Sequence, residues 1–203
     1  MKKWLVITSI ALAFSVNAVQ AAGNADEGKK NSAVCAGCHG ADGNSGLNPL
    51  WPKIAGQHPQ YIEKQLKDFK EGRRSDPLMT PMAMPLTDQG MADLAAYFSS
   101  QTKTVGTASA KLAAKGEQIY RAGNPETGVA ACMACHGPAG SGNPQAMFPQ
   151  LNGQLADYTV KTLKDFRDGN RTNDTAKMMQ GVVARMTDEE MEAVAQYIQG
   201  LSR

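Results

Sequence analysis

All four cysteines of this 203-residue chain stand in two short segments of the same pattern. The pattern is C-x-x-C-H, and it occurs as Cys35-Ala36-Gly37-Cys38-His39 and again as Cys132-Met133-Ala134-Cys135-His136. Two thiols three positions apart on a helical turn can reach two substituents of one flat ligand, and the adjacent histidine can then bind a metal at the centre of that ligand. This combination is typical of c-type haem attachment, in which both thiols become thioethers.

Two other interpretations would fit the cysteines alone. A single C-x-x-C can be a thioredoxin-like dithiol, and two such pairs can form a four-cysteine zinc site. Neither chemistry requires a histidine directly after the second cysteine. We therefore expect two covalently bound haem c groups, attached at Cys35, Cys38, Cys132 and Cys135, with His39 and His136 as iron ligands.

The two motifs belong to a longer internal repeat. The segment Trp51 to Gln57 (WPKIAGQ) aligns with Phe148 to Gln154 (FPQLNGQ) at the offset of 97 residues that separates His39 from His136. Three additional residues within 172–177 then raise this offset to 100 in the rest of the second half. Self-similarity over such lengths indicates duplicated structural units.

The start of the chain has the features of an exported protein. Lys2 and Lys3 precede a largely apolar stretch, residues 4–19, and small residues follow, as in a signal peptide cut after Ala21. We therefore expect a periplasmic protein. The predicted organisation is a signal peptide over residues 1–21, a first domain over 22–105 and a second over 106–203, with the polar segment 101–109 as linker.

The charge balance argues against some classes of partner. Lys and Arg number 21 and Asp and Glu number 19, and the excess of two lies in Lys2 and Lys3. The remainder has no net charge to attract nucleic acid or an anionic membrane, so we expect no nucleic-acid partner. Any electrostatic steering must then come from a local basic patch, for which a solvated helix face is the alternative. The best candidate patch is Lys64, Lys67, Lys70, Arg73 and Arg74.

Apolar residues recur at helical spacing, and sustained strand-like alternation is absent, so we expect an all-α fold. Helices are predicted from Pro59 to Gly72, from about Asp157 to Gly169, after Thr87, after Thr187 and over Leu112 to Tyr120. Thr187 and Glu190 have the spacing of a capping box. Gly116, with Gly28 as its counterpart, would let a crossing helix approach closely; the alternative is that these glycines merely weaken a helix.

The second ligand of each iron separates electron transfer from chemistry on a bound small molecule. His58 is the one histidine outside the two motifs, and it could serve a single haem. It aligns with Leu155, so the repeat does not preserve it. We therefore interpret His58 as a polar residue at the start of the Pro59 helix.

Methionine is the other common distal ligand, and the repeat selects the candidates. At the offset of 100 residues Met79 aligns with Met179, and Met91 aligns with Met191 on the apolar face of the final helices, where packing explains it. We predict that Met79 and Met179 lie on loops and are the distal ligands. The competing candidates are Met82 and Met84 in the first domain and Met178 in the second.

Two prolines are candidates for orienting the histidine rings. Pro52 lies 13 residues after His39, and Pro149 lies 13 residues after His136. A histidine that binds a metal usually donates its other ring N–H to a fixed acceptor, which a proline carbonyl can supply. The alternative is that both are rigid loop prolines without a part in the haem site.

The chain resembles the dihaem cytochromes c4 over nearly all of its length after residue 21. The resemblance rests on the two C-x-x-C-H motifs, the repeated Pro-x-Ile/Leu-x-Gly-Gln segments, and the segments Cys38 to Ser45, Asp165 to Asp174 and Tyr197 to Leu201. It implies two tandem class I cytochrome c domains, each enclosing a covalent haem, with the two haems facing each other. It also implies His39 and His136 as proximal ligands and Met79 and Met179 as distal ligands.

These features predict a carrier of electrons and not an enzyme. A thioether sulfur favours ferrous iron, and two filled axial positions keep oxygen and peroxide off the metal. The resemblance implies a periplasmic protein, free or attached to the outer face of the inner membrane, that delivers electrons to a membrane-bound cytochrome oxidase. We expect a quinol-oxidising complex or a dehydrogenase as donor.

Two other functions remain open at this point. One is the electron-accepting haem subunit of a dehydrogenase complex, such as a flavocytochrome-type sulfide dehydrogenase. The other is a dihaem peroxidase, which needs an iron with a vacant position. A structural or sensing module is less favoured, because two matched redox centres suggest a flow of electrons.

Overall fold

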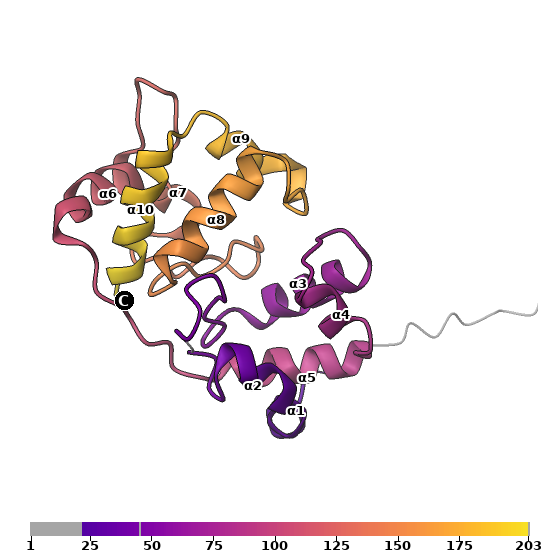
Figure 1. Cartoon of the computed structure of the whole chain (residues 1–203). Helices are drawn as coiled ribbons and strands as arrows, with labels where there is room; N and C mark the ends of the chain where they lie inside the picture. Colours follow the sequence, from indigo (N-terminus) through magenta and orange to yellow (C-terminus); the bar gives the residue numbers. More distant parts are fainter. Residues whose placement is uncertain (1–21, 45, 203) are drawn as a thin grey trace, which may run out of the picture.

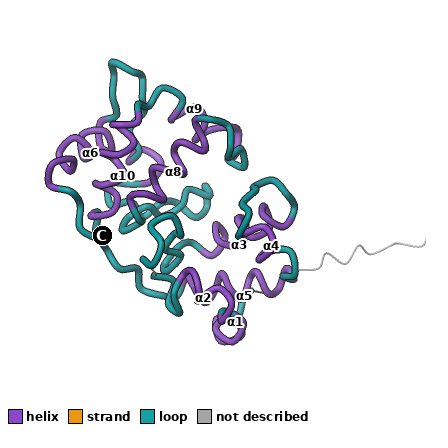
Figure 2. Tube along the Cα trace, viewed as in Figure 1, coloured by secondary structure: helices purple, strands orange, loops and turns teal. Residues whose placement is uncertain are grey.

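Helices joined by loops make up both halves of the structure, a computed structural model that describes residues 22–44 and 46–202. The predicted signal peptide lies outside the described residues. The first half contains α1 (Ala25–Asn31), α2 (Ala33–His39), α3 (Pro59–Lys70), α4 (Met79–Ala83) and α5 (Asp88–Ser99). The second contains α6 (Ala110–Ala122), α7 (Met133–His136), α8 (Ala156–Arg167), η1 (Thr175–Lys177), α9 (Met178–Val183) and α10 (Asp188–Gly200). No strand occurs among the described residues, which confirms the all-α prediction (Figure 2).

In each half the first helix packs across the last one: α1 packs against α5, and α6 packs against α10 (Figure 1). Gly28 and Gly116 lie at these crossings. A Cβ atom on Gly28 would stand 2.0 Å from the carbonyl oxygen of Asp93, and one on Gly116 would stand 2.1 Å from that of Ala193. Because no side chain fits at such distances, the prediction that these glycines permit a close helix approach is confirmed.

The residues that start the final helices act as the sequence predicts. The Thr87 hydroxyl accepts a hydrogen bond from the backbone N–H of Gly90 (3.0 Å) at the start of α5. Thr187 and Glu190 form a capping box at the start of α10. These bonds satisfy N–H groups that have no partner inside the helix, so they fix where each helix begins.

The prediction that the two candidate distal methionines lie on loops is wrong, because both lie on short helices. Met79 is the first residue of the five-residue helix α4, and Met179 is the second residue of the six-residue helix α9. The Asp76 carboxylate accepts hydrogen bonds from the backbone N–H groups of Leu78 (2.9 Å) and Met79 (3.0 Å), and so starts α4. Helices of fewer than two turns are too short to show helical periodicity in the sequence.

Two glutamines join the halves in a two-fold arrangement, and each bonds the backbone of the opposite half. The Gln57 amide donates to the carbonyl of Gln150 (2.9 Å) and accepts from its N–H (2.8 Å). Gln154, at the repeat position of Gln57, makes the same pair of bonds with Lys53 (2.8 and 2.9 Å). All four residues are buried, so these contacts hold the halves side by side, as Figure 1 shows.

Candidate functional site

The two C-x-x-C-H segments lie at matching places in the two halves. Cys35 and Cys38 lie on α2, and the second cysteine pair lies at the start and within the turn of α7. All four cysteines are half-buried and free of disulfides. Each helix ends directly after its histidine, where Gly40 (φ 79°) and Gly137 (φ 76°) adopt a backbone conformation that favours glycine. Each half thus presents two thiols and one imidazole on a single short helix.

Both motif histidines are buried, and each is oriented by a proline carbonyl. Nδ1 of His39 lies 2.8 Å from the carbonyl oxygen of Pro52, and Nδ1 of His136 lies 2.9 Å from that of Pro149. A carbonyl oxygen can only accept, so Nδ1 must carry the proton in each ring. The second ring nitrogen, Nε2, is then left with a lone pair that can bind a metal.

Burial also favours the form of histidine that binds metal. It lowers the pKa of His39 and of His136, and this effect outweighs the opposing contribution of the hydrogen bonds to Pro52 and Pro149. Both rings are therefore neutral at pH 7. A neutral imidazole is the form that ligates iron.

The cysteines do not have the properties of a dithiol catalyst or of a zinc site. Burial raises the pKa of Cys35, and it raises the pKa of Cys132 to about 11, whereas reactive dithiols have a lowered pKa. In the part of the chain that the structure describes, no group of three or more His, Cys, Asp or Glu side chains could hold a metal ion. The raised pKa values therefore argue against a dithiol catalyst.

Exposure separates the candidate distal methionines. Met79 and Met179 are both partly buried, and Met179 packs against the apolar core of its half. The competing side chains are exposed, with Met82 at 48%, Met84 at 54% and Met178 at 42%. A ligand to a haem inside the domain must point inward, so this contrast favours Met79 and Met179.

His58 lies at the contact between the halves. It precedes the first residue of α3, as the sequence predicts, and its Nε2 lies 2.8 Å from the carbonyl oxygen of Ser141 in the second half. Its ring therefore takes part in a contact between the halves.

Two arginines lie at the same contact: Arg74, which the sequence suggests as part of a basic patch, and Arg171, for which the sequence suggests no role. Arg74 lies over the ring of Phe69 in its own half and donates to the hydroxyl of Tyr158 in the other (3.2 Å). Arg171, its repeat equivalent, donates in turn to the hydroxyl of Tyr61 (2.9 Å). The sequence could have indicated these residues through the repeat, because both the arginines and the tyrosines recur at the offset that relates the two haem motifs.

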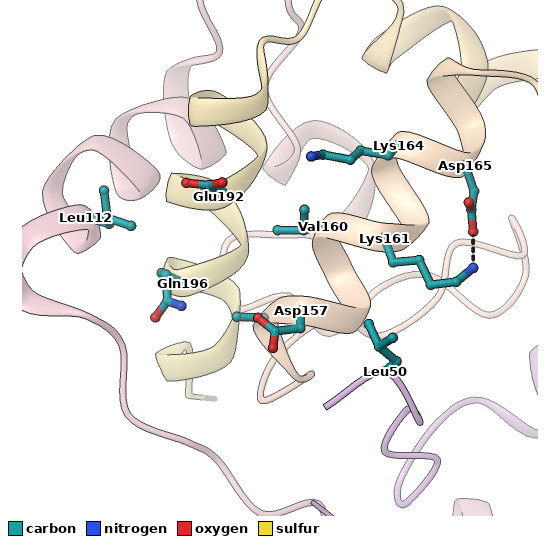
Figure 3. A pocket seen from close by; sticks show the side chains of 10 residues that line it. Leu50, Leu112, Asp157, Val160, Lys161, Lys164, Asp165, Glu192 and Gln196 are labelled. Carbon is teal, nitrogen blue, oxygen red and sulfur yellow. Dashed lines mark hydrogen bonds and ion pairs between the residues drawn. The ribbon is translucent and has the colours of Figure 1, made fainter. Parts of the chain in front are cut away.

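An open groove of about 540 Å³ lies in the second half, among α6, α8 and α10 (Figure 3). Leu112 and Val160 form apolar parts of its lining, together with Leu50 from the first half. Lys161 pairs with Asp165 at its edge (2.5 Å). None of the motif cysteines or histidines lines this groove, and we assign it no part in haem binding.

Two helical domains, each with a C-x-x-C-H helix and an oriented, neutral histidine, define a dihaem c-type cytochrome. The family model described as cytochrome c matches residues 25–102 and again residues 113–202. A cytochrome c4 from Thiocapsa roseopersicina is 59% identical over 88% of this chain and 92% of its own. The crystal structure of reduced recombinant cytochrome c4 from Pseudomonas stutzeri has a TM-score of 0.85 and 48% identity, covering 89% of this chain and 100% of that one. A thiosulfate dehydrogenase electron acceptor from Stutzerimonas stutzeri (strain A1501) is 37% identical over 96% of this chain and 93% of its own.

The chain belongs to the cytochrome c family and, within it, to the dihaem cytochromes c4. It is a dihaem electron carrier with two covalently bound haem c groups, as the sequence predicts. The thiosulfate dehydrogenase acceptor is a more distant relative than the two cytochromes c4, so the comparisons favour a carrier over a dehydrogenase subunit. No helix among the described residues is long and apolar enough to cross a membrane.

Proposed function

We propose that each haem iron is held between one histidine and one methionine, His39 with Met79 and His136 with Met179. Cys35 and Cys38 attach the first haem through thioethers, and Cys132 and Cys135 attach the second. Reversible one-electron reduction is the chemistry that the bound haems supply. The side chains named here would hold the iron and leave no position on it for other ligands.

The observation that carries this proposal is the pair of matched contacts between a histidine and a proline carbonyl. The carbonyls of Pro52 and Pro149 fix the tautomer and the ring plane of His39 and His136. With Nδ1 committed in this way, Nε2 of each ring is available to the metal. Met79 and Met179, which are both partly buried, would supply the second ligand of each iron.

The proposed role is to carry electrons in the periplasm and not to transform a substrate. Residues 1–21 act as the signal peptide, and the mature protein is free or held at the outer face of the inner membrane. A quinol-oxidising complex or a dehydrogenase reduces it, and a membrane-bound cytochrome oxidase accepts its electrons. The near-zero net charge after residue 21 means that local surfaces must guide these encounters.

The experiment that tests this role follows the oxidation state of the purified holoprotein in a stopped-flow spectrometer. Reduced protein mixed with membranes that contain the terminal oxidase should be reoxidised rapidly, and an oxidase inhibitor should stop the reaction. Peroxide added to the reduced protein should give no catalytic turnover, because both iron positions are filled. Rapid peroxide turnover, or no reaction with the oxidase, would contradict the proposal.

The same preparation distinguishes a dehydrogenase subunit from a free carrier. A free carrier should elute from gel filtration without a partner enzyme and should react with a soluble donor in solution. Stable co-purification with a flavin-containing protein would instead favour the electron-accepting subunit of a dehydrogenase complex.

A further inference from the structure

Asn173 of the second domain is held by helix α3 of the first. It lies in the segment where the second domain has three additional residues. Its side-chain amide donates to the carboxylate of Asp68 (2.6 Å) and to the side-chain carbonyl of Gln65 (3.0 Å). Its backbone carbonyl accepts a hydrogen bond from the ammonium group of Lys64 (2.8 Å). Both its side chain and its backbone are therefore fixed by the other domain.

Asp68 is the centre of this contact and is almost completely buried, with 1% of its side chain exposed. It also forms ion pairs with Lys64 and Arg73. Burial raises the pKa of Asp68, but hydrogen bonds from Lys64, Asn173 and Arg73 outweigh burial and lower it, so the group is a charged carboxylate. A buried carboxylate that loses a donor is unfavourable, and the position of Asn173 is accordingly well determined.

The equivalent contact toward the first domain has a different form. Lys161 and Asp165 align with the lysine and carboxylate just described and form the same ion pair (2.5 Å), but both side chains are more exposed. In the corresponding segment of the first domain, the carboxylate of Asp76 starts helix α4 within its own domain. The fixed contact therefore runs from the first domain into the second.

A short, constrained segment connects Asn173 to Met179. The next residue, Asp174, accepts hydrogen bonds from the backbone N–H (3.0 Å) and the side-chain amide (2.6 Å) of Gln180, which follows Met179. Ala176 and Lys177 have φ values of 53° and 55°. Residues other than glycine adopt this left-handed region when the surrounding contacts hold them there. A displacement of Asn173 must therefore move the start of α9 and the methionine on it.

We propose that Asp68 and Lys64 of the first domain are positioning residues for Met179, the distal methionine of the second domain. This inference rests on the proposed ligation of the second iron by Met179. Methionine ligation raises the potential of a haem, so the placement of the sulfur affects that potential. The potential of the second haem then depends on how the first domain is docked. Among the described residues, the equivalent pair Lys161 and Asp165 makes no such contact with the segment that leads to Met79.

The test uses two variants of the first domain in the holoprotein, Asp68→Asn and Lys64→Met. Their matched controls are Asp165→Asn and Lys161→Met, at the equivalent positions of the second domain. In the reduced protein each iron-bound methionine gives a separate, strongly shifted methyl signal in proton NMR. Met79→Ala and Met179→Ala assign the two signals, and a redox titration of each variant gives both potentials.

Asp68→Asn and Lys64→Met should shift or broaden the Met179 signal and lower the potential of the second haem, with the Met79 signal unchanged. The two controls should leave both signals at their wild-type positions. If Asp68→Asn fails to fold, Lys64→Met still decides, because its side chain is partly exposed and Asp68 keeps Arg73 as a partner.

Wild-type values for the Met179 signal and the second potential in a folded Lys64→Met variant would overturn the inference. Equal shifts of both methionine signals would also overturn it, because they would indicate a general loss of structure. Survival of both signals in Met179→Ala would show instead that the ligation on which the inference rests is wrong.

Discussion

The two domains share their helices and their histidine contacts, but they differ in the apolar side chains around the distal methionine. In the first domain Leu78, Met82 and Met84 are exposed. In the second, Val182 packs against the core, and Val183 and Met186 are buried within it. Leu78 and its repeat equivalent Met178 are exposed in both domains, and Ala83 and Val183 are buried in both, so the difference is carried by Val182 in place of Met82.

This difference shows that two domains with the same duplicated fold can have apolar cores of different size. The main apolar cluster of the first domain is small and consists of Ile62, Leu94, Ala95, Tyr97 and Phe98. The cluster of the second domain is larger and consists of Ile119, Tyr120, Val129, Phe166, Val183, Met186, Met191, Ala193, Val194, Ile198 and Leu201. We infer that the first domain depends more strongly on its haem, because domains of this size are marginally stable without a cofactor.

The largest expected effect comes from removing one haem at a time. A double substitution to serine at Cys35 and Cys38 should unfold most of the first domain, whereas the same change at Cys132 and Cys135 should leave more of the second domain folded. The reason is the larger apolar cluster of the second domain. Hydrogen exchange measured by mass spectrometry gives the protection of each domain separately. The wild-type holoprotein is the reference. Equal loss of protection in the two variants would contradict the inference that the first domain depends more strongly on its haem.

Removing a distal methionine should change one potential at a time. Met79→Ala and Met179→Ala should each lower the potential of one haem by a substantial part of the ~0.8 V that axial ligands span, and should open that iron to carbon monoxide. Met82→Ala, on the exposed face of α4, is the matched control. If carbon monoxide bound the first iron in Met82→Ala and not in Met79→Ala, Met82 would replace Met79 as the distal ligand of the first domain.

The helix crossings should respond alike in the two domains. Gly28→Ala and Gly116→Ala should each reduce the free energy of unfolding by about 1–3 kcal/mol, because the new methyl group overlaps the carbonyl of Asp93 or Ala193. Gly90→Ala is the control, since its Cβ would meet just the Thr87 hydroxyl, at 3.2 Å. Chemical denaturation followed by circular dichroism measures the effect. A loss as large in the control as in the other two variants would argue against the packing explanation.

The smallest effect concerns the pH dependence of the contact between the domains. Burial raises the pKa of Tyr158, but Arg74 and Arg171 more than offset this and lower it to about 8. The pKa of tyrosine in an unfolded chain is about 10, so between these values the native state binds fewer protons and stability rises with pH. We expect a gain below ~1 kcal/mol, because the side chain is partly exposed to solvent.

This prediction is checked by denaturation of the wild type and of Tyr158→Phe below pH 8 and near pH 10. The difference in stability between the two proteins should grow with pH in favour of the wild type. A constant difference would mean that Tyr158 stays protonated in the native state over this range.

Much of the site follows from residues that are close in sequence. The C-x-x-C-H spacing places two thiols and an imidazole on one helix, and the chain from His39 to Pro52 is short enough for the carbonyl to reach the ring. The repeat offset also selects Met79 and Met179 from a methionine-rich chain. These predictions needed no knowledge of how the domains pack.

Contacts between the domains could not be predicted in the same way. The repeat shows that Gln57 and Gln154 are equivalent, but not that both face the opposite domain, because this depends on how the two surfaces dock. The role of Asn173 is hidden for a further reason, since it lies where the repeat is interrupted. The helices at Met79 and Met179 were missed because side-chain capping, such as that by Asp76, leaves no periodic signal.

The most direct test of the account is a redox titration of the purified holoprotein with optical detection. We expect two one-electron transitions per chain, at high potential for c-type haems. In the oxidised state both haems should contribute to the red-region charge-transfer band of an iron–thioether bond. Spectra of two nitrogen ligands on either iron, or the absence of that band, would contradict the proposed clamping of each haem between histidine and methionine.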